Sequence, residues 1–362
     1  MRRSSYDAYR GRSRSRSILK GIIAVLAVLL VLAVLSLVFF QRYLIFSADG
    51  VHFELPFLHR TGEEPGDTPE PTLSELPEPE DLPVVVTTDP EIVDDPSGRI
   101  RAVLLPREAL HDGSAQQLLT DAGANAVILD MKADDGSLGY VSSLKLAGDI
   151  HATAAGSTLN DTIREFCSGE IYTVARVSCF RDNLLPYYRN GMALRKSGGN
   201  WRDELQLRWS SPASEKVWEY LIGVCTELVD LGFDEIWLDC AAFPTGGDLS
   251  RILSGENYSP GKLAAPVSGF YEALTSALAE EDVLLSVSAS LPAVLSGSDS
   301  VSGQTLEALA LFDRVWLRGA DDRREECLGA LRGAGYPDAE NALVLVDPAR
   351  EPTGDGCWAK TE

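Results

Sequence analysis

Acidic and basic side chains stand at the ends of several short apolar runs in this chain of 362 residues. Asp130 and Lys132 come at the end of one run, Arg176 lies within the next, and Asp239 ends a third. A carboxylate beside a guanidinium is held in its ionised form, and an ionised carboxylate can serve as a nucleophile or a general base. These residue types predict a polar pocket capable of acid–base chemistry, provided that the fold brings the runs together.

The runs that would position these residues are short and rich in β-branched side chains. Seven are expected as strands, at residues 100–105, 126–131, 172–180, 235–240, 283–289, 314–317 and 343–346. Amphipathic stretches expected as helices separate most of them, at residues 215–231, 266–279, 305–312 and 323–333. Apolar runs without strict alternation favour strands buried on both faces, as in a parallel sheet covered by helices. The repeat predicts the α/β class and a (β/α) barrel of the TIM type rather than an open sheet.

The eighth unit of such a barrel is incomplete in the sequence. Only sixteen residues follow Val346, enough for a short strand near Cys357 and Trp358 but too few for a full helix before it. We therefore expect a barrel that is truncated or irregularly closed at its last unit. In these barrels functional groups lie at the carboxyl ends of the strands, and strand alternation places Trp237 and Asp239 on the same side.

Three motifs at these strand ends resemble a known bacterial family. They are LDMKADDG at residues 129–136, ARVSCFRD at 175–182 and GFDEIWLDCAAFP at 232–244. In order and spacing they are similar to the putative glycosyl hydrolase domain family, whose barrels are distantly related to those of the α-amylase type. Trp201-Arg-Asp203 and Trp209 resemble the aromatic loop of that family, and Gly303-Gln304 resembles its later region. The resemblance covers about residues 99–320.

The resemblance implies a carbohydrate site. Asp239 would occupy the position of the acid proposed as the nucleophile at the end of the fourth strand. The neighbouring pocket groups would be Asp130, Lys132 and Arg176. Trp201 and Trp209 would be either platforms on which sugars stack or loop aromatics that close over the barrel. A retaining glycosidase also needs a second carboxyl group about 5–5.5 Å from its nucleophile.

The sequence also departs from the family pattern. The arginine usual before Phe-Pro is replaced by Ala242, the acid expected at the end of the fifth strand is replaced by hydroxyls in residues 287–290, and the sixth-strand motif is replaced by VWLRG at 315–319. No second carboxyl group is therefore assured opposite Asp239. The acids that could substitute are Asp130, Asp134 and Asp182.

The first 98 residues differ in composition from the rest. Residues 21–40 carry no charge and would span roughly 30 Å as a helix, the thickness of a bilayer core. Residues 1–20 hold seven basic residues and one acid, which favours a cytoplasmic N-terminus. The sequence thus predicts a single-pass anchor, with a cleaved signal peptide as the alternative. Within the juxtamembrane and linker segment 41–98, residues 61–98 hold eight prolines, twelve acids and no lysine or arginine, which predicts a disordered, extended spacer.

Several classes of function find no support in the composition. The net charge is −22, and residues 21–362 hold 53 acids against 25 basic residues, which argues against nucleic acid as a partner. The four histidines lack the spacing of a zinc site, and no glycine-rich nucleotide motif is present, so we expect neither a metal nor another cofactor. The six cysteines show no disulfide framework, and we expect free thiols, with a Cys179–Cys240 pair as the alternative.

The sequence therefore predicts a cell-membrane protein whose extracytoplasmic domain, residues 99–362, is a glycoside-hydrolase-like barrel that acts on or binds cell-envelope or extracellular glycans. In one hypothesis it is an enzyme in which Asp239 is the nucleophile or a stabiliser of the transition state, with an acid/base that the sequence does not identify. In another it is a non-catalytic glycan-binding or envelope-scaffold protein. A third hypothesis, a purely structural surface protein, predicts a pocket filled by side chains.

Overall fold

The computed structural model describes residues 44–47, 50–53, 99–347 and 356–361. The predicted basic tail at 1–20, the membrane segment at 21–40 and most of the linker at 41–98 lie outside these residues. Within the described ranges, no helix is both long and apolar enough to cross a membrane. Strands β1 (Leu44–Ser47) and β2 (Gly50–Phe53) pair antiparallel with each other and belong to a separate unit of the chain, residues 1–85.

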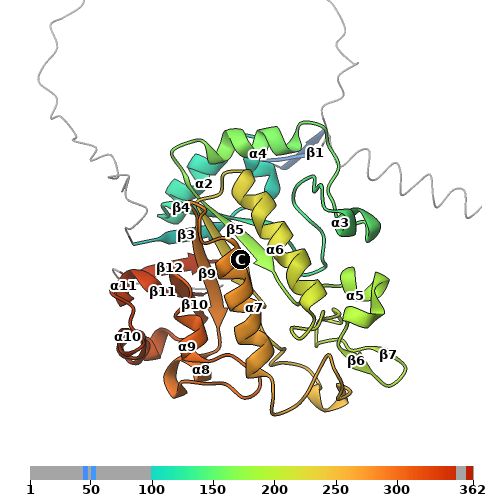
Figure 1. Cartoon of the computed structure of the whole chain (residues 1–362). Coiled ribbons are helices and arrows are strands. Elements are labelled where there is room, and N and C mark those ends of the chain that lie inside the picture. Colours follow the sequence, from blue (N-terminus) through green and yellow to red (C-terminus); the bar gives the residue numbers. More distant parts are fainter. Residues whose placement is uncertain (1–43, 48–49, 54–98, 348–355, 362) are drawn as a thin grey trace, which may run out of the picture. The chain divides into compact units, whose positions relative to one another are not determined.

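Eight parallel strands form a closed barrel (Figure 1). They are β3 (Arg101–Leu104), β4 (Ala126–Lys132), β5 (Tyr172–Ser178), β8 (Glu235–Asp239), β9 (Leu284–Ala289), β10 (Arg314–Arg318), β11 (Leu343–Val346) and β12 (Cys357–Lys360). Each strand pairs with the next along the chain, and β12 pairs with β3. The predicted TIM-type barrel is thus consistent with the structure.

The expectation of a truncated or irregularly closed last unit was wrong. Strand β12 pairs with β11 on one side and with β3 on the other, and the Trp358 amide donates a hydrogen bond of 3.0 Å to the Ile100 carbonyl. A strand of four residues is enough to close the sheet because its backbone groups bond to both neighbours. The short length of chain before the last strand therefore does not open the barrel.

Helices and short loops surround the strands. The helices are α2 (Ala115–Ala122), α3 (Lys145–Asp149), α4 (Leu159–Cys167), α5 (Leu185–Tyr188), α6 (Glu215–Asp230), α7 (Ala264–Ala277), α8 (Leu291–Ser296), α9 (Leu306–Leu309), α10 (Arg324–Gly333) and α11 (Ala339–Ala342). Figure 1 shows α6 and α7 side by side across the strands. Helix α6 buries Val217, Leu221, Val224 and Leu228, a spacing of three and four residues that places them on one face.

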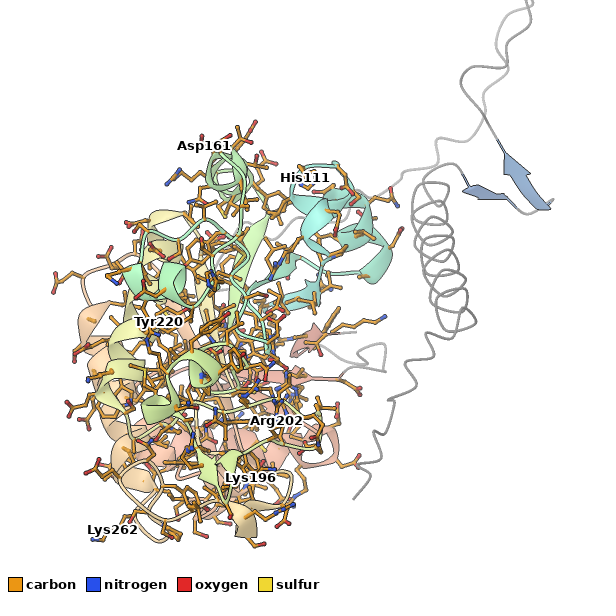
Figure 2. The ribbon with its side chains drawn as sticks, turned by 90° about the vertical axis from the view of Figure 1, so that its right-hand side faces the viewer. His111, Asp161, Lys196, Arg202, Tyr220 and Lys262 are labelled. Atoms are coloured by element: carbon orange, nitrogen blue, oxygen red, sulfur yellow. The ribbon has the colours of Figure 1, made fainter. Side chains whose placement is uncertain are left out.

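The long connections after β5 and β8 lie at one end of the barrel domain. The connection after β5 contains a small hairpin of β6 (Arg195–Lys196) and β7 (Gly199–Asn200). Figure 2 shows Lys196, Arg202 and Lys262, which belong to these two connections, at the opposite end from His111 and Asp161. Because both connections follow the carboxyl ends of parallel strands, these two long loops surround the end of the barrel where functional groups are expected.

The barrel interior is filled by side chains from alternate strand positions. Trp237 on β8 and Trp316 on β10 stack with their ring centroids 4.2 Å apart and pack with small and branched residues such as Ala102, Ile128 and Val174. On the same side of β8, Glu235 lies one alternate position below Trp237 and Asp239 lies one above it. The tryptophan pair therefore separates the polar residues at the two ends of the barrel.

Replacement of one stacked tryptophan tests this packing. The Trp316→Ala change removes a fully buried ring and leaves a cavity under the barrel mouth, so the free energy of unfolding is expected to fall by about 3–5 kcal/mol. Chemical denaturation of the full chain measures the loss. The control is Leu311→Ala, an exposed apolar residue, whose change is expected to stay within about 0.5 kcal/mol. Equal losses in the two variants would contradict the proposed packing role of the pair.

Candidate functional site

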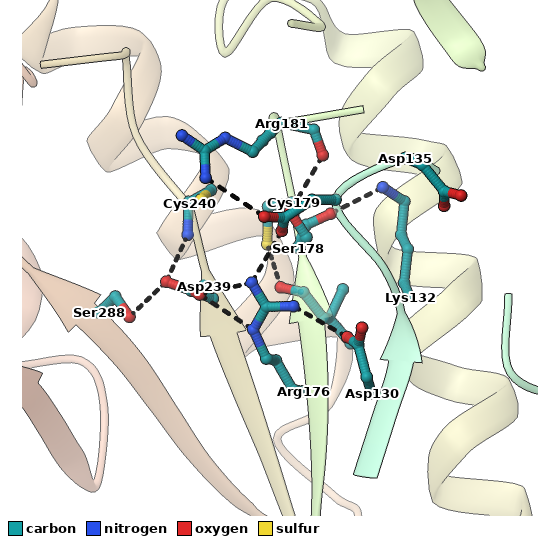
Figure 3. Close-up of polar contacts among 12 residues, drawn as sticks. Asp130, Lys132, Asp135, Arg176, Ser178, Cys179, Arg181, Asp239, Cys240 and Ser288 are labelled. Carbon is teal, nitrogen blue, oxygen red and sulfur yellow. Dashed lines mark hydrogen bonds and ion pairs between the residues drawn. The ribbon is translucent and has the colours of Figure 1, made fainter. Parts of the chain in front are cut away.

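Five strands bring polar side chains together at the carboxyl end of the barrel. Figure 3 shows four of these side chains, Asp130, Arg176, Asp239 and Ser288. Asp130 on β4, Arg176 on β5 and Asp239 on β8 come from neighbouring strands, and Ser288 on β9 and Arg318 on β10 follow on the other side. Asp130 is the register partner of Arg176 on the adjacent strand. Side chains from neighbouring strands therefore meet at a common barrel mouth, and Asp239 lies there on the side of β8 that alternation predicted.

The carboxylate of Asp239 is the most fully bonded group of the site. Its Oδ2 accepts hydrogen bonds from Arg176 Nε at 3.0 Å, from Arg176 Nη2 at 2.8 Å and from Arg318 Nη2 at 3.1 Å. Its Oδ1 accepts from Ser288 Oγ at 2.8 Å, from Arg318 Nη1 at 3.0 Å and from the Cys240 amide at 3.0 Å. Each oxygen thus accepts three bonds, and the residue is only 2% exposed. Because a carboxylate has about four lone-pair sites, none of them is left for a substrate.

The charges around Asp239 keep it ionised. Burial on its own would raise the pKa of Asp239, but the positive charges of Arg176 and Arg318, with hydrogen bonds from Arg318 and Ser288, hold that pKa far below its ordinary value. The backbone of Cys240 also contributes to the hydrogen bonding of Asp239. Cys240 adopts a left-handed conformation with φ of 49°, and its backbone N–H donates a hydrogen bond to the Asp239 carboxylate. That conformation is unfavourable for a residue other than glycine, and the surrounding contacts must stabilise it.

A single arginine bridges three carboxylates. Arg176 binds Asp239, donates from Nη1 to Asp130 Oδ1 at 2.9 Å, and donates from Nη2 to Asp134 Oδ1 at 2.7 Å. Asp134 Oδ1 and Asp239 Oδ2 therefore share one donor nitrogen, at 2.7 and 2.8 Å, and cannot be farther apart than the sum of these distances, about 5.5 Å. Burial alone would raise the pKa of Asp134, but Arg176 outweighs it and lowers that pKa. The second carboxyl group that the sequence left open is thus close by, and it too is ionised.

A second arginine extends the network toward the loop after β5. Arg181 donates to Asp203 Oδ2 at 2.9 Å and to Asp134 Oδ2 at 3.2 Å. Trp209 also donates its ring N–H to Asp203 Oδ2, at 3.0 Å, and its ring lies under the Arg181 guanidinium at 5.6 Å. Asp134 is therefore held between Arg176 and Arg181.

Lys132, expected to be a pocket group, is completely buried away from the pocket. Its Nζ lies 2.9 Å from Asp182 Oδ2 and donates to the Ser178 carbonyl at 2.7 Å, and both charged side chains are inaccessible to solvent. Asp182 in turn accepts from the amides of Leu184 and Leu185 at the start of α5. Lys132 has no access to a ligand in the mouth, and its contacts connect β4 to the loop after β5.

The two tryptophans expected near the ligand are also buried. Trp201 is 1% exposed and donates its ring N–H to the Asp248 carbonyl at 2.9 Å, and Trp209 is 5% exposed. Trp209 borders the mouth pocket, whereas Trp201 borders a smaller neighbouring pocket. Little ring surface is left for stacking on a sugar, which agrees better with the alternative that these aromatics close the loop over the barrel.

The polar cluster lies in an open pocket of about 720 Å³. Its walls include Asp134, Arg181, Glu204, Ala242 and Arg318. Ala242, where the family pattern has an arginine, leaves that part of the wall without a charged side chain. The purely structural hypothesis requires side chains to fill this pocket. A pocket of about 720 Å³ is left open, which contradicts that hypothesis.

The cysteines near the site carry no bond to one another. All six cysteines of the chain lie in the described part, and all are free thiols, so the Cys179–Cys240 pair is not formed. Burial and the charges of Asp239 and Asp134 raise the pKa of Cys240 to about 12, which leaves its thiol protonated and a poor nucleophile. In the described ranges, no group of three or more histidine, cysteine, aspartate or glutamate side chains could hold a metal ion.

Sequence reasoning did not select two residues that contact Asp239. Arg318 and Ser288 stand at the ends of the sixth and fifth strands, and their positions were visible in the sequence. Their types depart from the family pattern, and the family pattern gives no reason to expect them as partners for Asp239. The rule that side chains at the carboxyl ends of barrel strands converge was the signal that could have found them.

The ionised state of Asp239 makes a prediction about pH. Its pKa is lowered on folding, so its contribution to stability is complete above the unfolded value of about 3.9 and is lost as the pH falls toward the lower folded value. The variant Asp239→Asn lacks this contribution, and it removes the carboxylate bound by Arg318 and one of the three bound by Arg176. We expect it to lose about 3–5 kcal/mol at pH 7 and the gap to wild type to narrow by pH 3, as measured by chemical denaturation. A gap that stays constant with pH would show that the charge is not the cause.

Comparison with known proteins gives one family and several distant structures. Residues 111–312 match the model of the family described as "Putative glycosyl hydrolase domain". No curated protein matches the chain. A hypothetical protein from Ruminiclostridium thermocellum has 27% identity and a TM-score of 0.43, with 51% of this chain and 96% of that chain covered. The PgaB (BpsB) glycoside hydrolase domain from Bordetella bronchiseptica has 15% identity and a TM-score of 0.47, with 73% and 93% covered.

A third similar structure is a chitobiase from Flavobacterium johnsoniae, at 12% identity and a TM-score of 0.44, with 69% of this chain and 38% of that chain covered. These structural likenesses are distant, and the assignment depends on the family model, which spans more than half of the chain. The match includes the ends of β4, β5, β8 and β9, where Asp130, Arg176, Asp239 and Ser288 lie. The chain belongs to the family described as "Putative glycosyl hydrolase domain".

Proposed function

We propose that this protein binds carbohydrate in the pocket at the barrel mouth and does not hydrolyse it. The observation that carries the proposal is the saturation of Asp239, whose two oxygens accept six hydrogen bonds from Arg176, Arg318, Ser288 and the Cys240 amide. The pocket of about 720 Å³ remains open to a ligand. The fold alone does not determine a function. Carbohydrate is proposed as the ligand class because the chain belongs to a family described as a glycosyl hydrolase domain.

The chemistry of hydrolysis explains why the saturation matters. A retaining glycosidase needs one carboxylate free to attack the sugar and one carboxyl group that is protonated and can donate to the leaving oxygen. Asp239 has no free lone pair, and both Asp239 and Asp134 have lowered pKa values. Asp134 and Asp239 are therefore both ionised and held by arginines. The exposed edges of Asp134 and Arg318 can form hydrogen bonds with sugar hydroxyls.

Retaining hydrolysis is a second candidate because one observation favours it. Asp134 Oδ1 and Asp239 Oδ2 lie no more than about 5.5 Å apart, and this upper limit coincides with the separation of about 5–5.5 Å in such enzymes. For this activity, Arg318 would have to leave Asp239 when substrate enters. Its side chain is 47% exposed, so it is the partner of Asp239 with the most room to move.

The proposal extends to the cellular position of the barrel. The uncharged segment 21–40 is long enough to cross a bilayer, and the basic residues before it favour a cytoplasmic N-terminus. The acidic, proline-rich residues 61–98 would then hold the barrel away from the outer surface of that membrane. The ligand would be a glycan of the cell envelope or of the surroundings.

Retention and cleavage can be measured on the same sample. The full chain, purified in detergent micelles and immobilised, is exposed to a mixed panel of cell-envelope and plant oligosaccharides, and the effluent and eluate are read by mass spectrometry. We expect intact oligosaccharides to be retained by the wild type. The variant Ala242→Phe adds a ring at the pocket wall and replaces no member of the ion network, and it is expected to weaken retention by about tenfold or more.

Two controls separate the candidates. Asp161→Asn changes an exposed acid on α4 and is expected to retain sugars as the wild type does. Shorter fragments produced by the wild type but not by Asp239→Asn would overturn the binding proposal in favour of hydrolysis. Retention that survives Ala242→Phe unchanged would place the ligand outside this pocket.

A further inference from the structure

The loop after β5 is basic in an otherwise acidic protein. Residues 187–208 hold five basic side chains and two acidic ones, although the whole chain has a net charge of −22. The two acids, Asp203 and Glu204, both lie within ion-pair distance of Arg181. The positive charge of the loop is therefore not neutralised by its own acids.

Four of these five basic side chains have no ion pair. Among the residues that the structure describes, no carboxylate lies within ion-pair distance of Arg195, Lys196, Arg202 or Arg208, whereas Arg189 pairs with Asp149. The guanidinium groups of Arg202 and Arg208 instead bond to neutral oxygens. Two such cations side by side, without an acid between them, form a site that an anion would stabilise.

The two guanidinium groups are close to each other. Arg208 Nη1 donates to Asn183 Oδ1 at 2.7 Å, and Arg202 Nη1 donates to the same oxygen at 3.5 Å. The two nitrogens therefore cannot be more than about 6.2 Å apart, the sum of these distances. Two charge-assisted bonds of about 2.8 Å to the oxygens of one carboxylate or phosphate would span this separation. Partial burial together with the nearby Arg202 also lowers the pKa of Arg208, as expected for like charges without a counterion.

An exposed aromatic ring lies beside the pair. The Arg208 guanidinium stands 4.9 Å from the ring centroid of Tyr187, and Tyr187 is 56% exposed, which is high for an apolar ring. Tyr188 packs edge-on against it at 4.9 Å. An exposed ring next to cations provides apolar surface for a sugar face together with donors for its charged group.

Arg202, one member of the pair, borders a pocket next to the proposed ligand pocket. Lys196 and Arg202 border a smaller pocket of about 310 Å³, and Asp203 and Glu204 form a wall common to this pocket and the mouth pocket. Figure 2 shows Lys196 and Arg202 on the same side of the domain. A chain of sugars that occupies the mouth could continue past Glu204 to Arg202, beside which Arg208 lies.

We propose that Arg202 and Arg208, with Lys196 and Tyr187 beside them, form a subsite for an anionic sugar residue of the glycan that binds in the barrel mouth. This inference rests on the proposed carbohydrate binding. The planar fork of arginine matches two oxygens of a carboxylate or a phosphate. The ligand class is therefore an acidic oligosaccharide, in which a neutral part lies in the mouth and a charged substituent reaches the two arginines.

Calorimetry with matched sugars tests this subsite. The full chain in detergent micelles is titrated with trigalacturonate, which is acidic, and with galactotriose, its neutral counterpart. We expect the acidic trimer to bind about tenfold more tightly at low salt, and the preference to shrink as salt rises. The double change Arg202→Gln with Arg208→Gln is expected to remove the preference and to leave the affinity for the neutral trimer unchanged.

Further variants keep the result specific. Arg202→Lys with Arg208→Lys retains the charge without the fork and is expected to keep part of the preference. Arg164→Gln, an exposed arginine on α4, is expected to keep all of it. Far-ultraviolet circular dichroism of each variant shows whether it is folded.

The outcomes distinguish this inference from the proposed function. Neutral and acidic trimers that bind equally to the wild type, or a preference that survives the double glutamine change, would overturn the subsite and leave carbohydrate binding intact. Inorganic phosphate that binds as tightly as trigalacturonate through the same arginines would reduce the site to a plain anion site and also overturn it. Absence of binding by both trimers would count against the subsite and the proposed function together.

Discussion

The ion pair between Arg176 and Asp239 is the contact on which the arrangement of the barrel mouth depends. Arg176 is almost fully enclosed, and burial by itself would lower its pKa, but the carboxylates of Asp239, Asp134 and Asp130 raise it well above its ordinary value. A buried charge is tolerated only when such partners are present. Each carboxylate is therefore positioned by the same guanidinium, and loss of either member of the central pair would leave several others without compensation.

The closed barrel makes this ion cluster possible. Asp239 is held from opposite sides by Arg176 on β5 and by Arg318 on β10, and β10 is fixed by β9 and β11 in a sheet that closes through β12. The stacked Trp237 and Trp316 fill the interior beneath, and Trp237 donates its ring N–H to Ser288 Oγ at 3.0 Å. The apolar interior and the polar mouth thus share residues, so the packing of one orients the hydrogen bonds of the other.

The same contacts relate structure to activity. Strong hydrogen bonds and two positive charges stabilise an ionised Asp239, and these are the features that weaken it as a nucleophile, because attack requires a free lone pair. A site held in this way is suited to presenting fixed donors and acceptors to a ligand, since little reorganisation is needed on binding. The unpaired arginines of the loop after β5 lie outside this balanced cluster, which is why they are available to an anion while Arg176 and Arg181 are not.

The sequence by itself determined the class of fold and the side of each strand on which a residue lies. Apolar runs with intervening amphipathic stretches indicated the parallel barrel, and the period of two placed Asp239 on the inner side of β8 together with Trp237, because alternation is a local property of the backbone. Only the tertiary structure decided that Lys132 is enclosed with Asp182 and that Arg318 and Ser288 donate hydrogen bonds to Asp239. It also decided that the four residues 357–360 close the sheet. These outcomes depend on distances between side chains from strands far apart in the chain, which are set by the stagger of the barrel and by packing, and no local pattern carries that information.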